Sequence, residues 1–168
     1  MNSPLSVFFL TFLLAISTSY SCKTAPPRAR SFERKSISND LQLRNDIVNF
    51  AEKQLGTKYK YAGRSPKGFD CSGFTYFVMK KFDIHLSPSS RAQAKQGKKK
   101  LLKFVEAGDL IFFQKRKRVF HVALVVDNTS DGIKVIHSTN RGVVIDNISK
   151  SKYWEPKIGF ARDIVSEH

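Results

Sequence analysis

The stretch "GFDCSGF", residues 68–74, places a cysteine between an aspartate and a Ser-Gly step. Aspartate is a favoured helix N-cap residue, so a helix should begin directly after it. The apolar residues that follow share one helical face and predict a helix from about Ser72 to Phe82: Phe74, Phe77, Val78 and Phe82. Cys71 then stands at the amino end of a helix. A thiol there can be a packed small hydrophobe, half of a disulfide, a metal ligand or a nucleophile.

The first 21 residues carry no charge, and their apolar run from Leu5 to Ile16 has the length of the apolar region of a secretory signal. Cys22 follows at once, as in a bacterial lipoprotein signal whose cysteine becomes lipidated. Cleavage without lipid and an N-terminal membrane anchor are the alternatives. We expect residues 1–21 to be a signal peptide. We expect an exported protein of the cell envelope, either a membrane-anchored lipoprotein facing the periplasm or a secreted protein.

The chain contains two cysteines. If Cys22 is lipidated or removed, Cys71 has no intramolecular partner in an exported protein. A free thiol in that setting needs a chemical reason, which favours a reactive role over a disulfide.

Residues 22–39 are rich in proline, serine and basic residues, and we predict a flexible tether there. A single domain is predicted over residues 40–168. Its first helix should begin near Asp40 and end near Gly56, with one apolar stripe: Leu43, Ile47, Ala51 and Leu55. A loop over residues 57–70 should lead into the helix that begins near Cys71.

The second half changes to short runs of β-branched and aromatic residues separated by turn residues. Helices followed by strands with short connections predict an antiparallel sheet backed by helices, an α+β domain. The expected strands cover residues 109–114, 119–127, 133–138, 142–148 and 157–164.

Basic residues are in large excess, with 29 Lys and Arg against 14 Asp and Glu, a net charge of +15. Such a charge favours an anionic partner: nucleic acid, a membrane surface or an acidic polymer. The sequence has no phosphate-binding glycine loop and no RNA-binding signature, so no nucleic acid is expected. The runs at residues 98–100 and 115–118 are either solvated loops or contacts to anionic envelope polymers or lipids.

Two histidines lie in adjacent expected strands joined by the turn "DNTSDG", residues 127–132. We predict that His121 pairs directly opposite His137, on the apolar face that a helix would cover. A thiol delivered by that helix would then meet a base and a group that orients the base. Zinc bound by Cys71 and the two histidines is the alternative, but short zinc-ligand spacings are absent and no metal is expected.

The segments "LGTKYKYAGRSPKGFDCSGF", "GDLIFF", "HVALVV" and "VIHS" resemble, in this order, the motifs of the NlpC-type bacterial cell-wall cysteine peptidases. The resemblance implies a papain-like α+β domain, with N-terminal helices packed on a five- to six-stranded antiparallel sheet. It implies a peptidoglycan endopeptidase that cleaves stem-peptide amide bonds through a thioester, without a cofactor. Cys71 would be the nucleophile, His121 the base and His137 the residue that orients it.

The same resemblance implies further residues around the substrate. Tyr59 would lie near the oxyanion site, and other positions would shape the pocket or contact substrate: Asp70, Ser72, Ser89, Ser90 and Gln93. The chain departs from the family pattern at Pro88, where many members carry a substrate-side arginine. This departure bears on substrate preference and not on the reaction.

Two other function classes remain open from the sequence. A non-catalytic basic module that binds the cell wall would use the charge and not the thiol. An amidase or acyltransferase on a related fold would use the thiol on a different bond.

Overall fold

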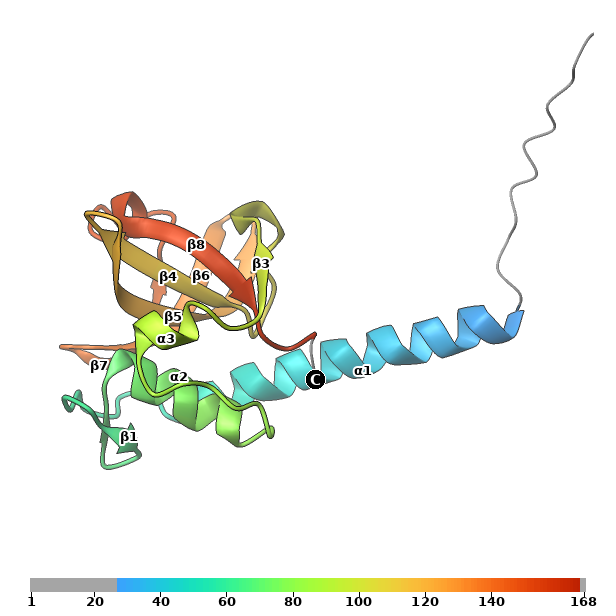
Figure 1. Ribbon diagram of the computed structural model, residues 1–168, viewed down its shortest axis with the longest axis horizontal. Coiled ribbons are helices and arrows are strands. Elements are labelled where there is room, and N and C mark those ends of the chain that lie inside the picture. Colours follow the sequence, from blue (N-terminus) through green and yellow to red (C-terminus); the bar gives the residue numbers. More distant parts are fainter. Residues whose placement is uncertain (1–26, 167–168) are drawn as a thin grey trace, which may run out of the picture.

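The computed structural model describes residues 27–166. The elements follow in the order α1 (Pro27–Glu52), β1 (Arg64–Ser65), β2 (Gly68–Phe69), α2 (Cys71–Lys80), α3 (Ser90–Gln93), β3 (Lys98–Lys100), η1 (Leu102–Phe104), β4 (Leu110–Lys115), β5 (Arg118–Thr129), β6 (Gly132–Thr139), β7 (Gly142–Asn147), η2 (Glu155–Lys157) and β8 (Ile158–Asp163). The three α-helices precede the six strands of the main sheet, as predicted, and Figure 1 shows α1 and α2 on one side of that sheet.

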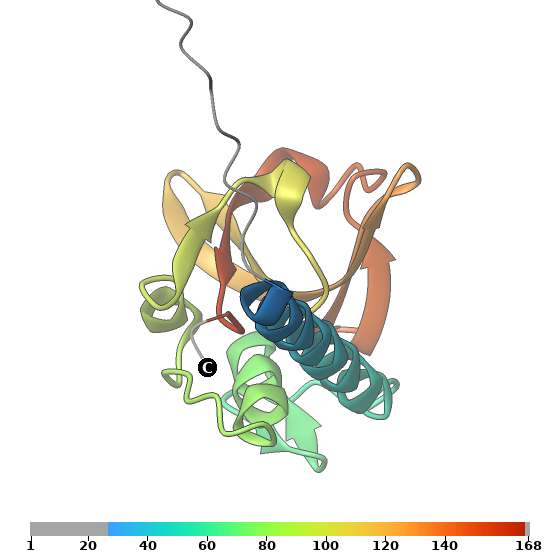
Figure 2. The same cartoon turned by 90° about the vertical axis from the view of Figure 1, so that its right-hand side faces the viewer.

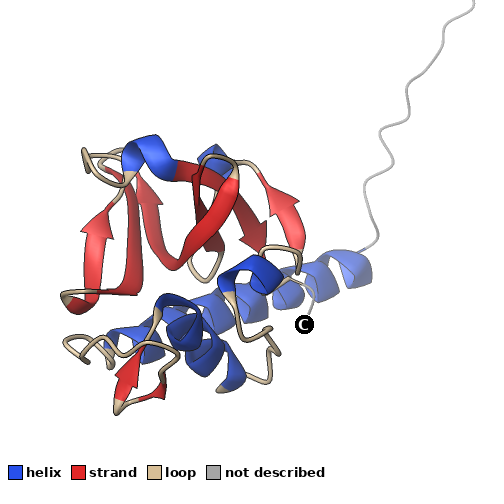
Figure 3. Ribbon diagram, turned by 60° about the vertical axis from the view of Figure 1, so that its left-hand side comes forward, coloured by secondary structure: helices blue, strands red, loops and turns tan. Residues whose placement is uncertain are grey.

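The main sheet has six strands in the order β3-β8-β4-β5-β6-β7, and each neighbouring pair is antiparallel. The predicted α+β architecture is therefore confirmed (Figure 3). The sequence did not predict β3, because three consecutive lysines have a low preference for strands. It pairs with β8 at the sheet edge, where Lys98 and Lys99 remain exposed to water.

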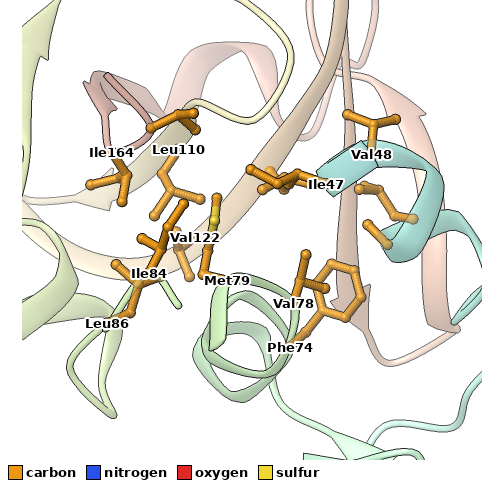
Figure 4. Packing of buried hydrophobic residues seen from close by; sticks show 14 of the residues in the cluster. Ile47, Val48, Phe74, Val78, Met79, Ile84, Leu86, Leu110, Val122 and Ile164 are labelled. Atoms are coloured by element: carbon orange, nitrogen blue, oxygen red, sulfur yellow. The ribbon is translucent and has the colours of Figure 1, made fainter. Parts of the chain in front are cut away.

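Both faces of the sheet are buried, but by different elements. The helices cover the face that carries Leu110, Val122 and Ile136, together with Ile47 of α1 and Phe74 of α2 (Figure 4). A second apolar cluster lies on the opposite face and includes Ile111, Phe113, Ala123, Val125, Val135 and Trp154. Residues alternate between the two clusters along β4 and β5, as the pleat requires.

Helix α1 begins at Pro27, well before the expected start near Asp40. Residues 27–39, predicted as part of a flexible tether, are helical. Proline is well suited to a first helical position, and the arginine, alanine, lysine and glutamate residues that follow have high helix propensity. The early turns of α1 extend beyond the sheet, as Figures 1 and 2 show. The division into tether and domain stays a prediction.

The predicted signal peptide and Cys22 lie outside the described residues. Within residues 27–166, no helix is both long and apolar enough to cross a membrane.

A buried arginine fixes α1 to the sheet. The Arg44 guanidinium is 2% exposed and donates to Asp109 Oδ1 and Asp163 Oδ1, both at 2.9 Å. Asp109 directly precedes β4, and Asp163 ends β8. Lys100 of β3 lies 3.0 Å from the second oxygen of Asp109. One ion-pair network therefore joins the first helix to three strands of the sheet.

Replacement of Arg44 by methionine should lower the free energy of unfolding by about 3–5 kcal/mol, because it leaves buried carboxylates without their partner. Urea denaturation followed by circular dichroism measures the loss. Lys53→Met removes an exposed cation just past the end of the same helix and should change stability by less than about 0.5 kcal/mol. Equal stability of the two variants would contradict the structural role of Arg44.

Candidate active site

The amino end of α2 is built by the motif around the cysteine. Asp70 is the N-cap in extended conformation, and its Oδ1 accepts the Gly73 N–H at 2.6 Å. Ser72 Oγ donates to the same oxygen at 3.1 Å. These bonds start the helix at Cys71, so the thiol stands on its first turn.

Residue 73 is glycine because there is no room for a side chain at this position. A side chain on Gly73 would collide with the carbonyl oxygen of Gly63, in the loop that precedes the helix. That carbonyl also accepts the N–H of Asp70 at 3.1 Å. The loop carrying Tyr59 is therefore held close against the first turn of α2, beside the thiol.

A β-bulge in β5 decides which face carries His121. Near the turn, Asn128 lies opposite Ile133, whereas beyond the bulge Val125 lies opposite Val135. The extra residue, Val126, shifts the pairing of β5 with β6 by one residue, so every side chain beyond it changes face relative to β6. Without it His137 would share a face with Leu124 and not with His121.

The predicted register between the two histidines is wrong in detail. Because Leu124 lies opposite Ile136, His121 would align with Thr139, two positions beyond His137. The two histidines are diagonal neighbours on the same face, which is still within reach of ring side chains. That face is also not the one the helices cover, because His121 packs against Trp154 with ring centroids 4.7 Å apart.

Thiol and imidazole nevertheless meet in one pocket of about 720 Å³ at the end of the sheet. The pocket is lined by Tyr59, Cys71, Phe120, His121, Ser138, Thr139, Asn140, Arg141, Asp146, Ser151, Tyr153 and Trp154. Cys71 also accepts a backbone hydrogen bond from Val122, the residue next to His121. The helix thus delivers the sulfur to the strand that carries the histidine.

A chain of hydrogen bonds runs from His121 through the buried His137 to Asp146, which also lines the pocket. His121 Nε2 lies 3.0 Å from His137 Nδ1, and His137 Nε2 lies 3.1 Å from Asp146 Oδ2. Trp154 Nε1 donates to the same carboxylate oxygen at 3.2 Å. His121 is 7% exposed and His137 is fully buried. The predicted pair of histidines is therefore held by a carboxylate that the sequence analysis did not identify.

Asp146 and Trp154 were missed for different reasons. Thr139 pairs with Gly142 across a two-residue loop, and this register puts Asp146 of β7 diagonal to His137 on one face. The two-residue turn between β6 and β7 fixes the register of the two strands, so Asp146 could have been predicted from the sequence. Trp154 lies in an irregular segment before η2, where strand alternation gives no information.

The carboxylate determines which ring nitrogens carry protons. An ionised Asp146 only accepts hydrogen bonds, so His137 Nε2 must be protonated. In neutral His137 the other nitrogen, Nδ1, is then an acceptor, and His121 Nε2 must donate to it. Nδ1 of a neutral His121 therefore keeps its lone pair and is the basic nitrogen of that ring.

Burial controls the charge of the reactive groups. It raises the pKa of the Cys71 thiol, although the backbone hydrogen bond from Val122 opposes the shift. Burial also lowers the pKa of His121, and the nearby His137 lowers it further. The amino end of a helix favours a thiolate, but both shifts favour an uncharged thiol beside an uncharged imidazole in the free protein.

Asp146 remains an acceptor at neutral pH. Burial alone would raise its pKa, but hydrogen bonds from Arg141 and His137 hold the pKa below its ordinary value. Burial lowers the pKa of His137, while its bond to Asp146 acts in the opposite direction.

The other predicted site residues lie outside the pocket lining. Gln93 is fully buried and bridges α2 to the loop before α3, accepting from Thr75 and donating to the carbonyl oxygens of Ser72 and Ser87. Ser89 caps α3, and Ser90 is its first residue. Asp70 and Ser72 build the start of α2, as described above. Of the predicted substrate residues, Tyr59 alone lines the pocket.

The zinc alternative gains no support from the geometry. Nε2 of His121 and Nδ1 of His137 are hydrogen-bonded to each other, so they do not converge on a common point with the thiol. Over residues 27–166 no group of three or more His, Cys, Asp or Glu side chains is arranged to hold a metal ion.

Comparison with known proteins agrees with the fold. The NlpC/P60 family profile matches residues 56–162, which contain Cys71, both histidines and Asp146. The chain belongs to the NlpC/P60 family.

Individual relatives carry names of enzymes. The Gamma-DL-glutamyl hydrolase of Bacillus subtilis is 39% identical over 127 residues, which cover 72% of this chain and 30% of the relative. The Murein DD-endopeptidase MepS/Murein LD-carboxypeptidase of Escherichia coli is 26% identical over 146 residues, covering 86% and 75%. The chain spans less than a third of the length of the first curated relatives it matches. The solved NlpC/p60 domain of the peptidoglycan hydrolase SagA is 29% identical with a TM-score of 0.58, covering 70% of this chain and 95% of that one.

Nitrogen-15 NMR of the histidine rings tests the hydrogen-bond chain without any substrate. At neutral pH, both His121 and His137 should be in the Nε2–H tautomer, because Asp146 accepts from the inner ring. In Asp146→Ala, which removes the acceptor, His137 should become a mixture of tautomers. Asp146→Asn keeps an acceptor oxygen and should preserve the wild-type pattern. Asp131→Asn, an exposed aspartate in the β5–β6 turn, is the control. A wild-type tautomer pattern in Asp146→Ala would contradict the role of Asp146.

Proposed function

We propose that this chain is a cysteine endopeptidase that hydrolyses amide bonds in the stem peptides of peptidoglycan. Membership of the NlpC/P60 family supports the proposal, as do the names of the murein endopeptidase from E. coli and of the peptidoglycan hydrolase SagA. The observation that carries it is the 3.0 Å bond between His121 and His137, directly behind a pocket that Cys71 also lines. A module that only binds the wall needs no such arrangement.

Acylation begins with the uncharged pair. Nδ1 of His121 takes the proton of the Cys71 thiol as the sulfur attacks the amide carbonyl carbon. Negative charge develops on the carbonyl oxygen, and in the proposed mechanism the backbone N–H of Cys71 and the Tyr59 hydroxyl would stabilise it. The imidazolium then gives its proton to the amine nitrogen, the C–N bond breaks, and a thioester remains on the sulfur.

Deacylation uses the same base. His121 takes a proton from a water molecule that attacks the thioester carbonyl, and the thiol leaves reprotonated. Throughout the cycle His137 and Asp146 hold the His121 ring in one orientation and one tautomer. The positive charge that His121 carries transiently is stabilised through His137 by the Asp146 carboxylate.

We also propose an envelope location with an anionic partner. The uncharged leader and Cys22 support export and lipid anchoring, and the +15 charge supports contact with anionic envelope polymers or lipids. Lipidation would place the domain on the membrane, within reach of the wall, through α1 and the residues before it.

Purified protein incubated with defined muropeptides, followed by mass analysis of the products, tests the function. Wild-type protein should release stem-peptide fragments, and Cys71→Ala should release none. His121→Ala should lower kcat/KM by at least about 10²-fold, because the general base is lost. His85→Ala, which removes an exposed histidine outside the pocket, is the matched control and should behave as wild type.

Other outcomes of this experiment would indicate a different nucleophile or a different class of protein. Product formation that survives Cys71→Ala excludes this thiol as the nucleophile. A cut between sugar and peptide, or acyl transfer without peptide cleavage, identifies an amidase or acyltransferase. No turnover combined with salt-sensitive retention on sacculi identifies a binding module.

The pH dependence of kcat/KM should reflect the buried imidazole. His121 must be neutral to act as a base, so activity falls as pH drops below its pKa. Because burial lowers that pKa from its ordinary value of 6.5, the acidic midpoint should lie below pH 6.5. Rates measured with a neutral peptide amide avoid titration of substrate carboxylates, and circular dichroism at each pH confirms folding. A midpoint at or above 6.5 would contradict the water-poor environment of His121.

A further inference from the structure

The loop between β4 and β5 is made of basic residues in an unfavourable backbone conformation. Lys115 pairs with Arg118, so Arg116 and Lys117 form a two-residue hairpin loop. Both have positive φ, 50° and 62°. We call Lys115–Arg118 the basic tip.

Two positive φ values in a two-residue hairpin loop are the signs of a type I′ turn, for which Asn-Gly is the preferred sequence. Side chains with a Cβ and a long stem are disfavoured in this left-handed region. Arg116 and Lys117 therefore cost the fold stability that an Asn-Gly loop would not. Backbone strain of this kind is concentrated at functional positions of proteins.

The basic tip offers its charges to solvent. All four side chains are exposed, and no ion pair joins any of them to a carboxylate among the described residues. Lys115, Arg116 and Arg118 line a hollow of about 480 Å³. The hollow is many times the size of a water molecule and has room for several charged groups.

The basic tip stands beside the candidate active site. Phe120, two residues after Arg118, lines the pocket together with His121. At the rise of an extended strand, Arg118 is about 7 Å from Phe120 along β5. A chain held at the tip can therefore run past the mouth of the pocket.

We propose that the basic tip binds a phosphate-bearing polymer of the envelope and so holds the protein at its substrate. The inference rests on the proposed function only for placing the protein in the envelope, because the binding itself does not use the thiol. Arginine forks match phosphate oxygens in pairs, and adjacent cations match repeated charges along a chain.

Two features favour a polymer over the other anions. A single small anion would leave most of the 480 Å³ hollow and its cations unused. A membrane-binding loop would present an apolar side chain for insertion, whereas all four residues of the tip are charged.

The test variant combines Arg116→Asn with Lys117→Gly. It should be more stable than the wild-type protein but should bind the polymer more weakly. Its Tm should rise by about 3 °C, because the new loop suits the turn. Its affinity for a synthetic poly(glycerol phosphate), measured by calorimetry at 0.1 M salt, should fall about tenfold. The slope of log Kd against log salt concentration should fall by about 1–2, one phosphate contact being lost per cation.

The control combines Lys53→Asn with Lys81→Asn. It removes the same charge from exposed positions away from the tip and should leave the affinity within about twofold of wild type. Unchanged binding in the Arg116→Asn, Lys117→Gly variant, or an equal loss in the control, would overturn the proposal.

Two further probes decide the chemistry of the partner. Binding to poly-L-glutamate as tight as to the phosphate polymer would overturn phosphate as the recognised group. Tighter binding to phosphatidylglycerol vesicles would overturn the polymer as the source. Cys71→Ala should bind the polymer as wild type does, so a protein that binds polymer without cleaving muropeptides would sink the proposed function and leave this inference standing.

Discussion

One additional residue in β5, Val126, sets which face of the sheet carries His121 relative to His137. Side chains alternate at every position along a strand, so an insertion of one residue reverses the face of everything beyond it. If the pairing near the turn continued without the bulge, His137 would lie opposite Leu124, on the face that the helices cover. The bulge brings the two imidazoles to the same face, where β7 adds Asp146 and the segment before η2 adds Trp154. The polar chain behind the pocket therefore exists because the ladder is interrupted at one place.

The thiol reaches this polar chain from the other side of the sheet. Helix α2 packs on the face opposite the histidines, and its amino end brings Cys71 to the pocket that His121 of β5 also lines. This geometry depends on backbone contact: Gly73 lets the loop at Gly63 lie against the first turn of the helix. Arg44 holds α1 to the strands behind α2. The site is thus positioned by contacts that are far from it in sequence.

Sequence patterns predicted the parts of the fold that local periodicity controls. The helix at Cys71 and five of the six strands of the main sheet follow from spacing, apolar residues and turn residues. The shared face of the two histidines was also predicted, but it depends on the bulge at Val126, which the sequence analysis did not identify. The early start of α1 and the short β3 did not, because propensity and sheet pairing determine them and apolar periodicity does not. The helix-covered face was assigned wrongly because both faces of the strands are apolar, so alternation could not distinguish them. Asp146 was missed because the register of β7 was not worked out.

Charge is distributed in opposite ways inside and outside the protein. The hydrogen-bonded set of His121, His137 and Asp146 contains two buried imidazoles and one ionised carboxylate. Burial favours the neutral form of both rings. In the proposed mechanism, the positive charge on His121 would therefore arise in a place with little water, where the Asp146 carboxylate interacts with it more strongly than it would in solution. The excess of cations lies instead on the surface, with four of them concentrated in the turn between β4 and β5. Because β5 begins in this turn and carries His121, the strand links the charged surface to the candidate active site. An anionic polymer bound at the turn would stay in water and would not enter the pocket. An amide group attached to that polymer would be brought to the pocket.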